Sequence, residues 1–289
     1  MRILFIHGRA QGGKEPATLR QTWIDTLEKG LRAAGLRLPD GVQFDFPYYA
    51  DTLDGYVAAL NDPNPDTVVE MGAGGTSPLD EFIAQALDEI AHNAEIPEAE
   101  VQQLVEGPPV TEMGPQNWRW VRALARAIDK RVTPGTEWTI KRFLTDVHLY
   151  IANRSIQRAI NAIVAEKLTD EPTVVVGHSL GSVVGYRLLG DLEDSRNILR
   201  YVTLGSPLGI KAIANRLGIP QHVGRPTWFN AYDKRDIVAL NPLDNKRFPT
   251  QPAILNHDRV NNRTKNRHGI IGYLDDPEVA QAVVEGLEG

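Results

Sequence analysis

Residues 173–190 read TVVVGHSLGSVVGYRLLG, a strand pattern, a sharp turn and a helix pattern in immediate succession. The β-branched residues before the turn are typical of a buried strand. At the turn, Ser179 stands between Gly177 and Gly181, and a tight strand-to-helix turn strains the serine backbone and leaves no room for side chains at the glycines. The helix N-terminus behind the turn also directs free N–H groups toward the serine. We therefore predict that Ser179 is a nucleophile and does not merely cap the helix.

Similar strand and helix patterns alternate on both sides of this stretch. Further strand patterns lie at residues 2–6, 42–49, 198–207, 225–233 and 253–260. Apolar residues at helical spacing run from Leu19 to Leu31 and return near the end of the chain, in residues 275–287. This alternation predicts an α/β fold with a mainly parallel central sheet that is flanked by helices on both faces.

Residues 50–172 differ from the rest, because they contain helix and loop patterns and no convincing strand. Ser77 and Asp80 form a capping box that predicts the start of one helix. Further helical patterns lie at 98–106, 116–131 and 138–168. We interpret residues 50–172 as a mostly helical insertion, a cap or lid within a single domain of residues 1–289. We expect its aromatic residues to pack on the sheet rather than to line a substrate pocket: Trp118, Trp120, Trp138, Phe143 and Tyr150.

Two motifs resemble those of the α/β-hydrolase family, a family of serine hydrolases, in its lipase and esterase branch. They are Phe5-Ile6-His7-Gly8 and the elbow Gly177-His178-Ser179-Leu180-Gly181. The alternating strand and helix pattern extends the resemblance over most of the chain outside 50–172. The resemblance implies the α/β-hydrolase fold and a Ser-His-Asp triad, with the acid and then the histidine downstream of the serine.

A serine needs an adjacent base, and the base needs a carboxylate that orients it. The family has its catalytic histidine in a loop after the last strand, and His268 lies in such a loop. His257 is the second candidate, although it falls within a strand pattern, and His222 is disfavoured because it precedes the acid. For the acid, the resemblance favours Asp236, which is followed by Ile-Val as is typical of the family. Asp233 is the alternative and otherwise serves as a turn residue.

A tetrahedral oxyanion needs two preorganised N–H donors. The resemblance implies that one belongs to Leu180, the residue after the nucleophile, and the other to the loop after the first strand, with Arg9 as the first candidate and Ala10 as the second. We expect the Arg9 side chain to face solvent or an anionic part of a substrate. We expect substrate contacts from residues beside these donors: His7, Gly8 and His178.

Residues 8–14 read GRAQGGK and also match the GxxxxGK spacing of a phosphate-binding loop. Such a loop requires Ser or Thr after the lysine to bind Mg²⁺. Here Glu15 follows, and its charge would repel a triphosphate, while Pro16 comes directly after it. We therefore interpret Gly12, Gly13 and Lys14 as the turn that leads into the first helix.

Composition excludes several other classes of protein. The chain has 289 residues, a net charge of −6 and no cysteine, so disulfides and thiol catalysis are excluded and binding to nucleic acid is not favoured. No apolar run is long enough for a signal peptide or a membrane span, which predicts a cytoplasmic protein. No HExxH motif is present and no GxGxxG motif follows a strand, so we expect no metal and no cofactor.

The sequence thus predicts a serine hydrolase that cleaves carboxylic esters through Ser179, His268 and Asp236 and an acyl-enzyme intermediate. The expected partner is a small-molecule or lipid ester substrate, and nothing indicates the oligomeric state. Thioesters and amides, including peptides, are alternative substrates because they are cleaved by the same machinery. The alternative from another class is a catalytically silent α/β-hydrolase scaffold that acts as a binding protein.

Overall fold

The computed structural model describes residues 1–61, 77–131, 139–192, 197–224 and 227–288, except for 109, 112 and 115. Trp138, one of the aromatic residues expected to pack the insertion, lies outside these residues. Within them, six strands form one sheet in the order β2-β1-β3-β4-β5-β6, and every neighbouring pair is parallel. The strands are β1 (Arg2–Ile6), β2 (Gln43–Asp45), β3 (Thr173–His178), β4 (Ile198–Leu204), β5 (Thr227–Ala231) and β6 (Leu255–His257). The prediction of an α/β fold with a mainly parallel sheet is confirmed.

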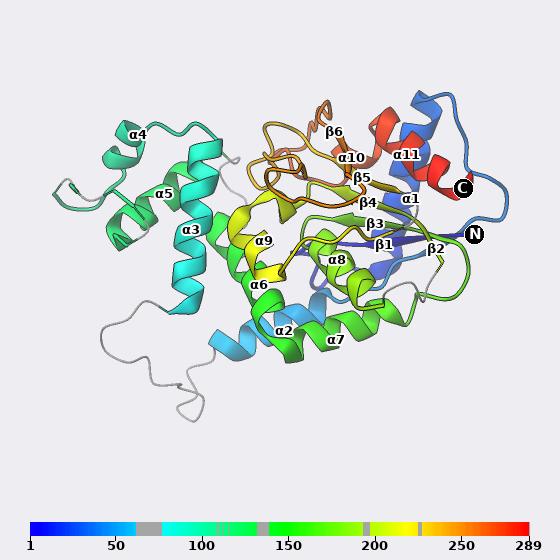
Figure 1. Ribbon diagram of the computed structural model, residues 1–289, viewed down its shortest axis with the longest axis horizontal. Helices are drawn as coiled ribbons and strands as arrows, with labels where there is room; N and C mark the ends of the chain where they lie inside the picture. Colours follow the sequence, from blue (N-terminus) through cyan, green and yellow to red (C-terminus); the bar gives the residue numbers. More distant parts are fainter. Residues whose placement is uncertain are drawn as a thin grey trace.

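Helices cover both faces of the sheet (Figure 1). In β1, Ile3 and Phe5 belong to one hydrophobic cluster, whereas Leu4 and Ile6 belong to the other. The first face carries α1 (Pro16–Ala33), α10 (Ile271–Leu274) and α11 (Pro277–Glu288), and the second carries α8 (Leu180–Leu192) with α7 (Arg154–Ala165) beside it. Because both faces are buried, the central strands read as continuous apolar runs.

β2 is shorter than the strand pattern at 42–49 and ends at Asp45. The residues that follow turn toward the loop after β1. There the ring of Phe46 stacks on that of His7 with centroids 5.4 Å apart, and the Tyr48 hydroxyl donates a hydrogen bond to the carbonyl oxygen of Gln11 at 2.7 Å. These contacts hold the segment against the loop rather than in the sheet, so the apolar pattern alone overestimates the strand.

Within its described residues, the segment 50–172 contains six helices and no strand. Besides α7 they are α2 (Ala50–Asn61), α3 (Pro78–Asn93), α4 (Glu98–Gln103), α5 (Trp118–Arg131) and α6 (Ile140–Ala152). The predicted capping box is confirmed, because Ser77 Oγ accepts from the N–H of Asp80 at 3.1 Å and the Asp80 carboxylate accepts from the N–H of Ser77 at 3.4 Å. The helical pattern at 138–168 corresponds to two helices, α6 and α7, which are separated at Asn153. Asn153 is extended there, with ψ of 105°, and its side chain caps the start of α7.

The helices α3, α4 and α5 form a lobe beyond the edge of the sheet, and α6 and α9 (Lys211–Leu217) lie between this lobe and the strands (Figure 1). Phe82 of α3, Trp120 of α5 and Phe143 of α6 are all buried. They belong to the same hydrophobic cluster as Val175 of β3. The segment 50–172 and the sheet therefore share one core.

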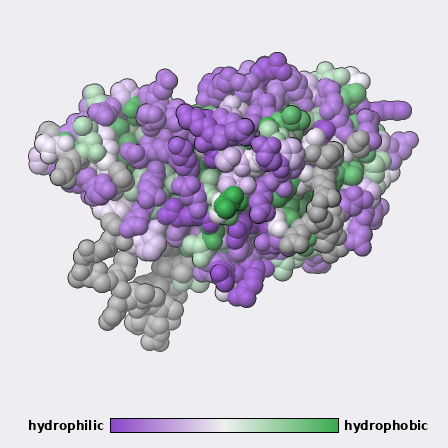
Figure 2. Space-filling view, viewed as in Figure 1, coloured by the Kyte–Doolittle hydropathy of each residue, from purple (hydrophilic) through white to green (hydrophobic). Residues whose placement is uncertain are grey.

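The face of the molecule seen in Figure 2 is mostly hydrophilic, with small hydrophobic patches scattered over it. The exposed large apolar side chains include Ile219 and Ile271. In the described part of the chain, no helix combines the length and the apolar character that crossing a membrane requires.

The carboxyl ends of the parallel strands all lie along one edge of the sheet. β1 and β3 are neighbours in this sheet. From β1 the chain crosses to β2 on one side, and from β3 it proceeds through β4, β5 and β6 on the other. In parallel α/β sheets, such a change of direction is the usual place for a ligand, beyond the carboxyl ends of the two strands. The loop after β1 and the turn that holds Ser179 both lie at this place.

Candidate active site

The turn between β3 and α8 holds Ser179 in a left-handed backbone conformation, with φ of 54°. Its N–H donates a hydrogen bond to the carbonyl oxygen of Leu204 in the neighbouring strand at 3.0 Å. A Cβ on Gly181 would lie 2.1 Å from the carbonyl oxygen of Ile6, and a Cβ on Gly177 would lie 2.9 Å from that of Gly181. Only glycine fits at both positions, as expected for a strained serine turn.

Ser179, His268 and Asp236 form a continuous chain of hydrogen bonds. Ser179 Oγ lies 2.7 Å from Nε2 of His268, and Nδ1 of His268 lies 2.6 Å from Oδ2 of Asp236. All three side chains are buried. Ser179 lies in the turn after β3, Asp236 in the loop between β5 and β6, and His268 in the loop between β6 and α10. The structure therefore brings together the three residues that the sequence predicts as a triad.

Asp236 has two further partners that hold its carboxylate in place. The Tyr273 hydroxyl donates to Oδ2 at 2.6 Å, and the N–H of Val238 donates to Oδ1 at 3.2 Å. Burial, and then the charge of Asp236, raise the pKa of Tyr273 well above its usual value, so the phenol keeps its proton. Tyr273 was not predictable from the sequence, because the direction of its hydroxyl depends on how α10 packs and has no local signal.

Asp233, the alternative acid, is held by a different set of partners. Its carboxylate accepts hydrogen bonds from the guanidinium of Arg235 at 3.0 and 2.9 Å and from the N–H of Asn262 at 2.8 Å. Burial alone would raise the pKa of Asp233, but these hydrogen bonds outweigh it and lower the pKa below its usual value. Asp233 therefore stays ionised and ties the loop after β5 to the loop that leads to His268.

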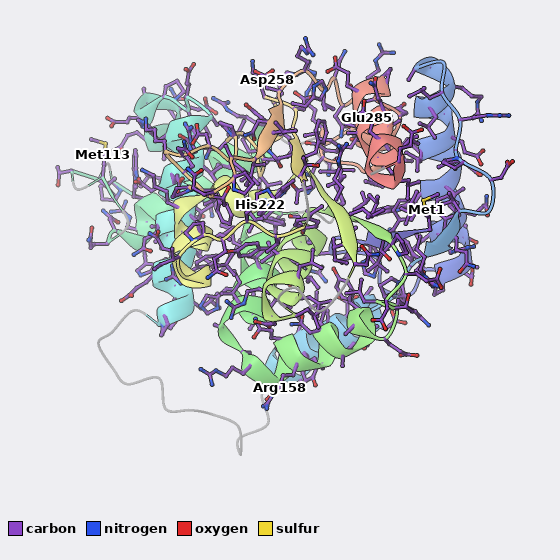
Figure 3. All side chains as sticks on the ribbon, turned by 45° about the vertical axis from the view of Figure 1, so that its right-hand side comes forward. Met1, Met113, Arg158, His222, Asp258 and Glu285 are labelled. Carbon is purple, nitrogen blue, oxygen red and sulfur yellow. The ribbon has the colours of Figure 1, made fainter. Side chains whose placement is uncertain are left out.

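His257, the second candidate base, faces carboxylates at the start of α11. Its Nδ1 lies 3.1 Å from Glu278 and its Nε2 lies 3.4 Å from Asp276. The next residue, Asp258, directly follows the carboxyl end of β6 and is labelled there in Figure 3. His257 thus fastens β6 to α11.

The loop after β1 brings its backbone close to Ser179. A Cβ on Gly8 would lie 2.9 Å from the Cβ of Ser179, so glycine is needed for this approach. Within the described residues, neither the N–H of Arg9 nor that of Leu180 donates a hydrogen bond to the protein. Leu180 begins α8, where N–H groups have no partner inside the helix. Ala10, the other candidate donor, is exposed and has a left-handed φ of 59°.

The Arg9 side chain is buried and forms an ion pair with Asp146 of α6, and the two side chains are only 6% and 4% exposed. It therefore does not face solvent, which was the first of its two expected places. Burial raises the pKa of Asp146, and the nearby Arg9 opposes this shift. The ion pair ties the loop after β1 to the helical segment 50–172.

A cavity of about 410 Å³ adjoins Ser179 and His268. The loop after β1, the first turns of α1 and the segment that leads into α10 form its walls. Gly8 and His178 are among the described residues that line it, whereas His7 is not. No group of three or more His, Cys, Asp or Glu side chains in the described part of the chain is arranged to hold a metal ion. Because the cavity adjoins Ser179 and His268, a small molecule that enters it reaches the hydrogen-bonded chain.

The rings of His7 and His178 both bind backbone groups. His7 stacks on Tyr49 with centroids 4.1 Å apart, its Nδ1 donates to the carbonyl oxygen of Gly8 at 2.7 Å, and its Nε2 accepts from the N–H of Tyr49 at 3.2 Å. His178 Nε2 donates to the carbonyl oxygen of His268 at 2.8 Å. Burial, and then the neighbouring His268, hold the pKa of His178 well below its usual value. Both rings therefore hold the loops around the site in place.

His7 predicts a loss of stability in acid. Burial lowers its pKa from 6.5 to about 4. Above pH 6.5 the ring is neutral in both the folded and the unfolded chain. Below that pH the unfolded chain gains a proton that the folded chain does not accept until about pH 4. The free energy of unfolding therefore falls as the pH falls through this window, by about 3 kcal/mol in total for this residue.

The measurement is urea denaturation of the wild type and of His7→Gln at a series of pH values from 7 down to 4. We expect the wild type to be the more stable protein at pH 7, because glutamine does not reproduce the ring stacking. The difference between the two proteins in the free energy of unfolding should then narrow by about 3 kcal/mol toward pH 4. A difference that stays constant over the series would contradict a buried, neutral His7.

No protein-family model and no curated protein matches the chain. Its function is therefore inferred from the chemistry of this site.

Proposed function

We propose that the protein is a serine hydrolase of the α/β-hydrolase type that cleaves carboxylic esters. One observation carries this proposal: Ser179 Oγ, the His268 ring and the Asp236 carboxylate are joined by hydrogen bonds of 2.7 and 2.6 Å. A serine is a weak nucleophile until a base accepts its proton, and this geometry supplies the base and orients it. The strained turn that presents Ser179 and the adjoining cavity support the same function.

In the first step, Ser179 Oγ attacks the carbonyl carbon of the ester while Nε2 of His268 accepts its proton. Asp236 accepts the hydrogen bond from Nδ1 and stabilises the imidazolium that forms. The negative charge moves to the former carbonyl oxygen. The N–H groups of Arg9 and Leu180 are the proposed donors to this oxyanion, each contributing about 2.7–4 kcal/mol to the transition state.

In the second step, the tetrahedral intermediate collapses and His268 donates its proton to the leaving alcohol. The acyl group remains on Ser179 as an ester. Water then attacks this acyl-enzyme with His268 again acting as the base, and the acid is released. Tyr273 keeps the carboxylate of Asp236 in position throughout, because its hydroxyl stays protonated.

We propose that the segment 50–172 is a cap of this single domain. Helix α6 reaches the site at two points, since Asp146 pairs with Arg9 and the Phe143 ring lies edge-on to that of His268 with centroids 6.2 Å apart. The core that this segment shares with the sheet supports a single folded unit.

Thioesters and amides remain the alternative substrates, because both are cleaved through the same acyl-enzyme. A silent binding scaffold is the less favoured reading. Such a scaffold has no use for a buried serine, histidine and carboxylate in one hydrogen-bonded chain, and burying these polar groups costs stability.

The test is reaction with a fluorophosphonate, followed by a panel of esters, thioesters and amides that share one acyl group. We expect one phosphonyl group per chain, found by mass spectrometry on the peptide that contains Ser179, and the highest kcat/KM on the esters. Faster cleavage of a thioester or amide would overturn the choice of bond. A protein that neither reacts with the probe nor cleaves any member of the panel would not be a serine hydrolase.

A further inference from the structure

The cavity beside Ser179 is lined by both apolar and polar side chains. The apolar ones include Leu19 and Trp23 of α1 and Ile271 of α10. The polar ones include Gln11, Lys14 and Asn266, which lie in the loops before these two helices. Ile271 is 47% exposed, so the apolar wall extends to the protein surface. A ligand that contacts both kinds of side chain has to be amphiphilic.

The cavity carries positive charge. Arg9 and Lys14 line it, and none of its described lining residues is a carboxylate. The charge of Arg9 is offset by Asp146. Within the described residues, the ammonium group of Lys14 contacts only neutral groups, the carbonyl oxygen of Ala10 at 3.0 Å and Oε1 of Gln11 at 3.1 Å. Because an ammonium group has three donors, its charge and one donor remain for a ligand.

Two carboxylates contact the same loop without lining the cavity. Asp51 accepts a hydrogen bond from the N–H of Gly13 at 2.8 Å, and the carboxylate of Asp54 lies against Gly12. Their charges make the glycine turn unsuited to a triphosphate, although its GxxxxGK spacing matches a phosphate-binding loop. The lysine of this spacing lines the cavity instead.

We propose that the cavity binds an ester that carries a compact negative charge, such as a carboxylate, and that Lys14 holds this charge. The proposal rests on the serine hydrolase function and specifies its substrate class. The protein as a whole has a net charge of −6 and therefore repels anions. A cation at the cavity counteracts this repulsion locally and favours an anionic substrate there. The apolar part of the substrate packs against Trp23 and Ile271. A volume of about 410 Å³ is near the small end for ligand sites and fits a compact ester rather than a long-chain lipid.

The experiment compares matched pairs of esters that differ only in charge. One pair carries the charge on the alcohol side, para-carboxyphenyl butanoate and its para-carbamoyl counterpart. The other pair carries it on the acyl side, the monophenyl ester of pimelic acid and the terminal amide of that ester. The quantity measured is the ratio of kcat/KM for the anionic member to that for the neutral member. The proteins are the wild type, Lys14→Gln, Lys14→Arg and Lys246→Gln, the last being an exposed lysine that does not line the cavity.

For at least one pair, we expect Lys14→Gln to lower this ratio about tenfold, because one opposite charge next to the ligand is lost. Lys14→Arg and Lys246→Gln should keep the ratio within about twofold of the wild type, and added salt should lower the wild-type ratio. The pair that responds identifies the side of the ester that carries the charge. A ratio that Lys14→Gln leaves unchanged for both pairs would overturn the proposal.

A binding experiment separates this inference from the proposed chemistry. The probe is the butananilide that corresponds to the first ester, with a carboxylate or with a carboxamide in the para position. Titration calorimetry with Ser179→Ala, and with the same variant carrying Lys14→Gln, requires no turnover. We expect the carboxylate probe to bind more tightly and to lose about tenfold in affinity without Lys14. Equal affinities for both probes in both proteins would overturn the charge preference, whether or not the wild type hydrolyses esters.

Discussion

Replacing Ser179 by alanine should abolish reaction with a fluorophosphonate and lower kcat for ester hydrolysis about 10⁶-fold, the loss seen when the nucleophile of a serine hydrolase is removed. The hydroxyl is the only group lost, and His268, Asp236 and the backbone donors remain in place. Without Oγ no acyl-enzyme forms, and the imidazole has no serine proton to accept. The measurements are mass spectrometry of the labelled protein and initial rates on the best ester.

Ser182→Ala is the matched control for this substitution. Ser182 lies in the first turn of α8 and is fully buried. Its hydroxyl donates to the carbonyl oxygen of Ser179 at 2.6 Å and accepts from the hydroxyl of Ser206 at 2.7 Å. Its loss removes both buried hydrogen bonds and should cost about 1–3 kcal/mol of stability, and it should leave the labelling intact. If Ser179→Ala still reacts with the probe at the wild-type rate, another residue is the nucleophile and the proposed mechanism is wrong.

The strained turn at Ser179 was predictable because its constraints appear in five consecutive residues. Gly177 is required by contacts within the turn itself, with Gly181 and Ser182. Gly181 is required by the carbonyl oxygens of Ile6 and His7, which belong to a different segment of the chain. Gly181 therefore reflects a contact between α8 and the end of β1, although the motif itself does not show which segment makes this contact. For this reason the motif predicts a fold as well as a nucleophile.

The resemblance to the α/β-hydrolases predicted the acid and the base from chain order and from their places after strands, and the Ile-Val that follows Asp236 favoured it over Asp233. Asp236 and His268 each lie in a loop that follows a strand of the parallel sheet, and such loops meet at the carboxyl edge. Asp233 and His257 lie close to them in the sequence but have other partners in the structure. Strand order thus predicts which loops meet, but not which of two neighbouring carboxylates turns inward.

Contacts between residues far apart in the sequence could not be predicted in this way. The pair of Arg9 and Asp146 and the bond from Tyr273 to Asp236 depend on how α6 and α10 pack, and neither leaves a periodic signal. The break at Asn153 is a different case. Asparagine before a helix is a common cap, and the apolar periodicity of 138–168 concealed this local signal.

Asp236→Asn should lower kcat about 10⁴-fold, the effect of removing the orienting carboxylate from a serine triad. Oδ2 of Asp236 accepts from both His268 and the Tyr273 hydroxyl. If the asparagine oxygen keeps these bonds, the imidazolium loses its counter-charge. If the amide nitrogen faces the ring instead, Nδ1 has to accept, and Nε2 carries the proton and can no longer act as the base. KM should change little, since Asp236 does not line the described wall of the cavity.

Asp233→Asn provides the comparison, because it removes the charge of a second buried carboxylate on the same loop. Asp233 binds Arg235 and Asn262, so the substitution should cost about 1–3 kcal/mol of stability and keep kcat within about threefold of the wild type. The pKa of Asp233 is lowered in the fold. Its stabilising effect is therefore present at neutral pH and lost as the pH falls through the folded pKa, and the two proteins should converge in acid. The opposite result, a large loss of kcat with Asp233→Asn and a small one with Asp236→Asn, would transfer the role of the acid to Asp233.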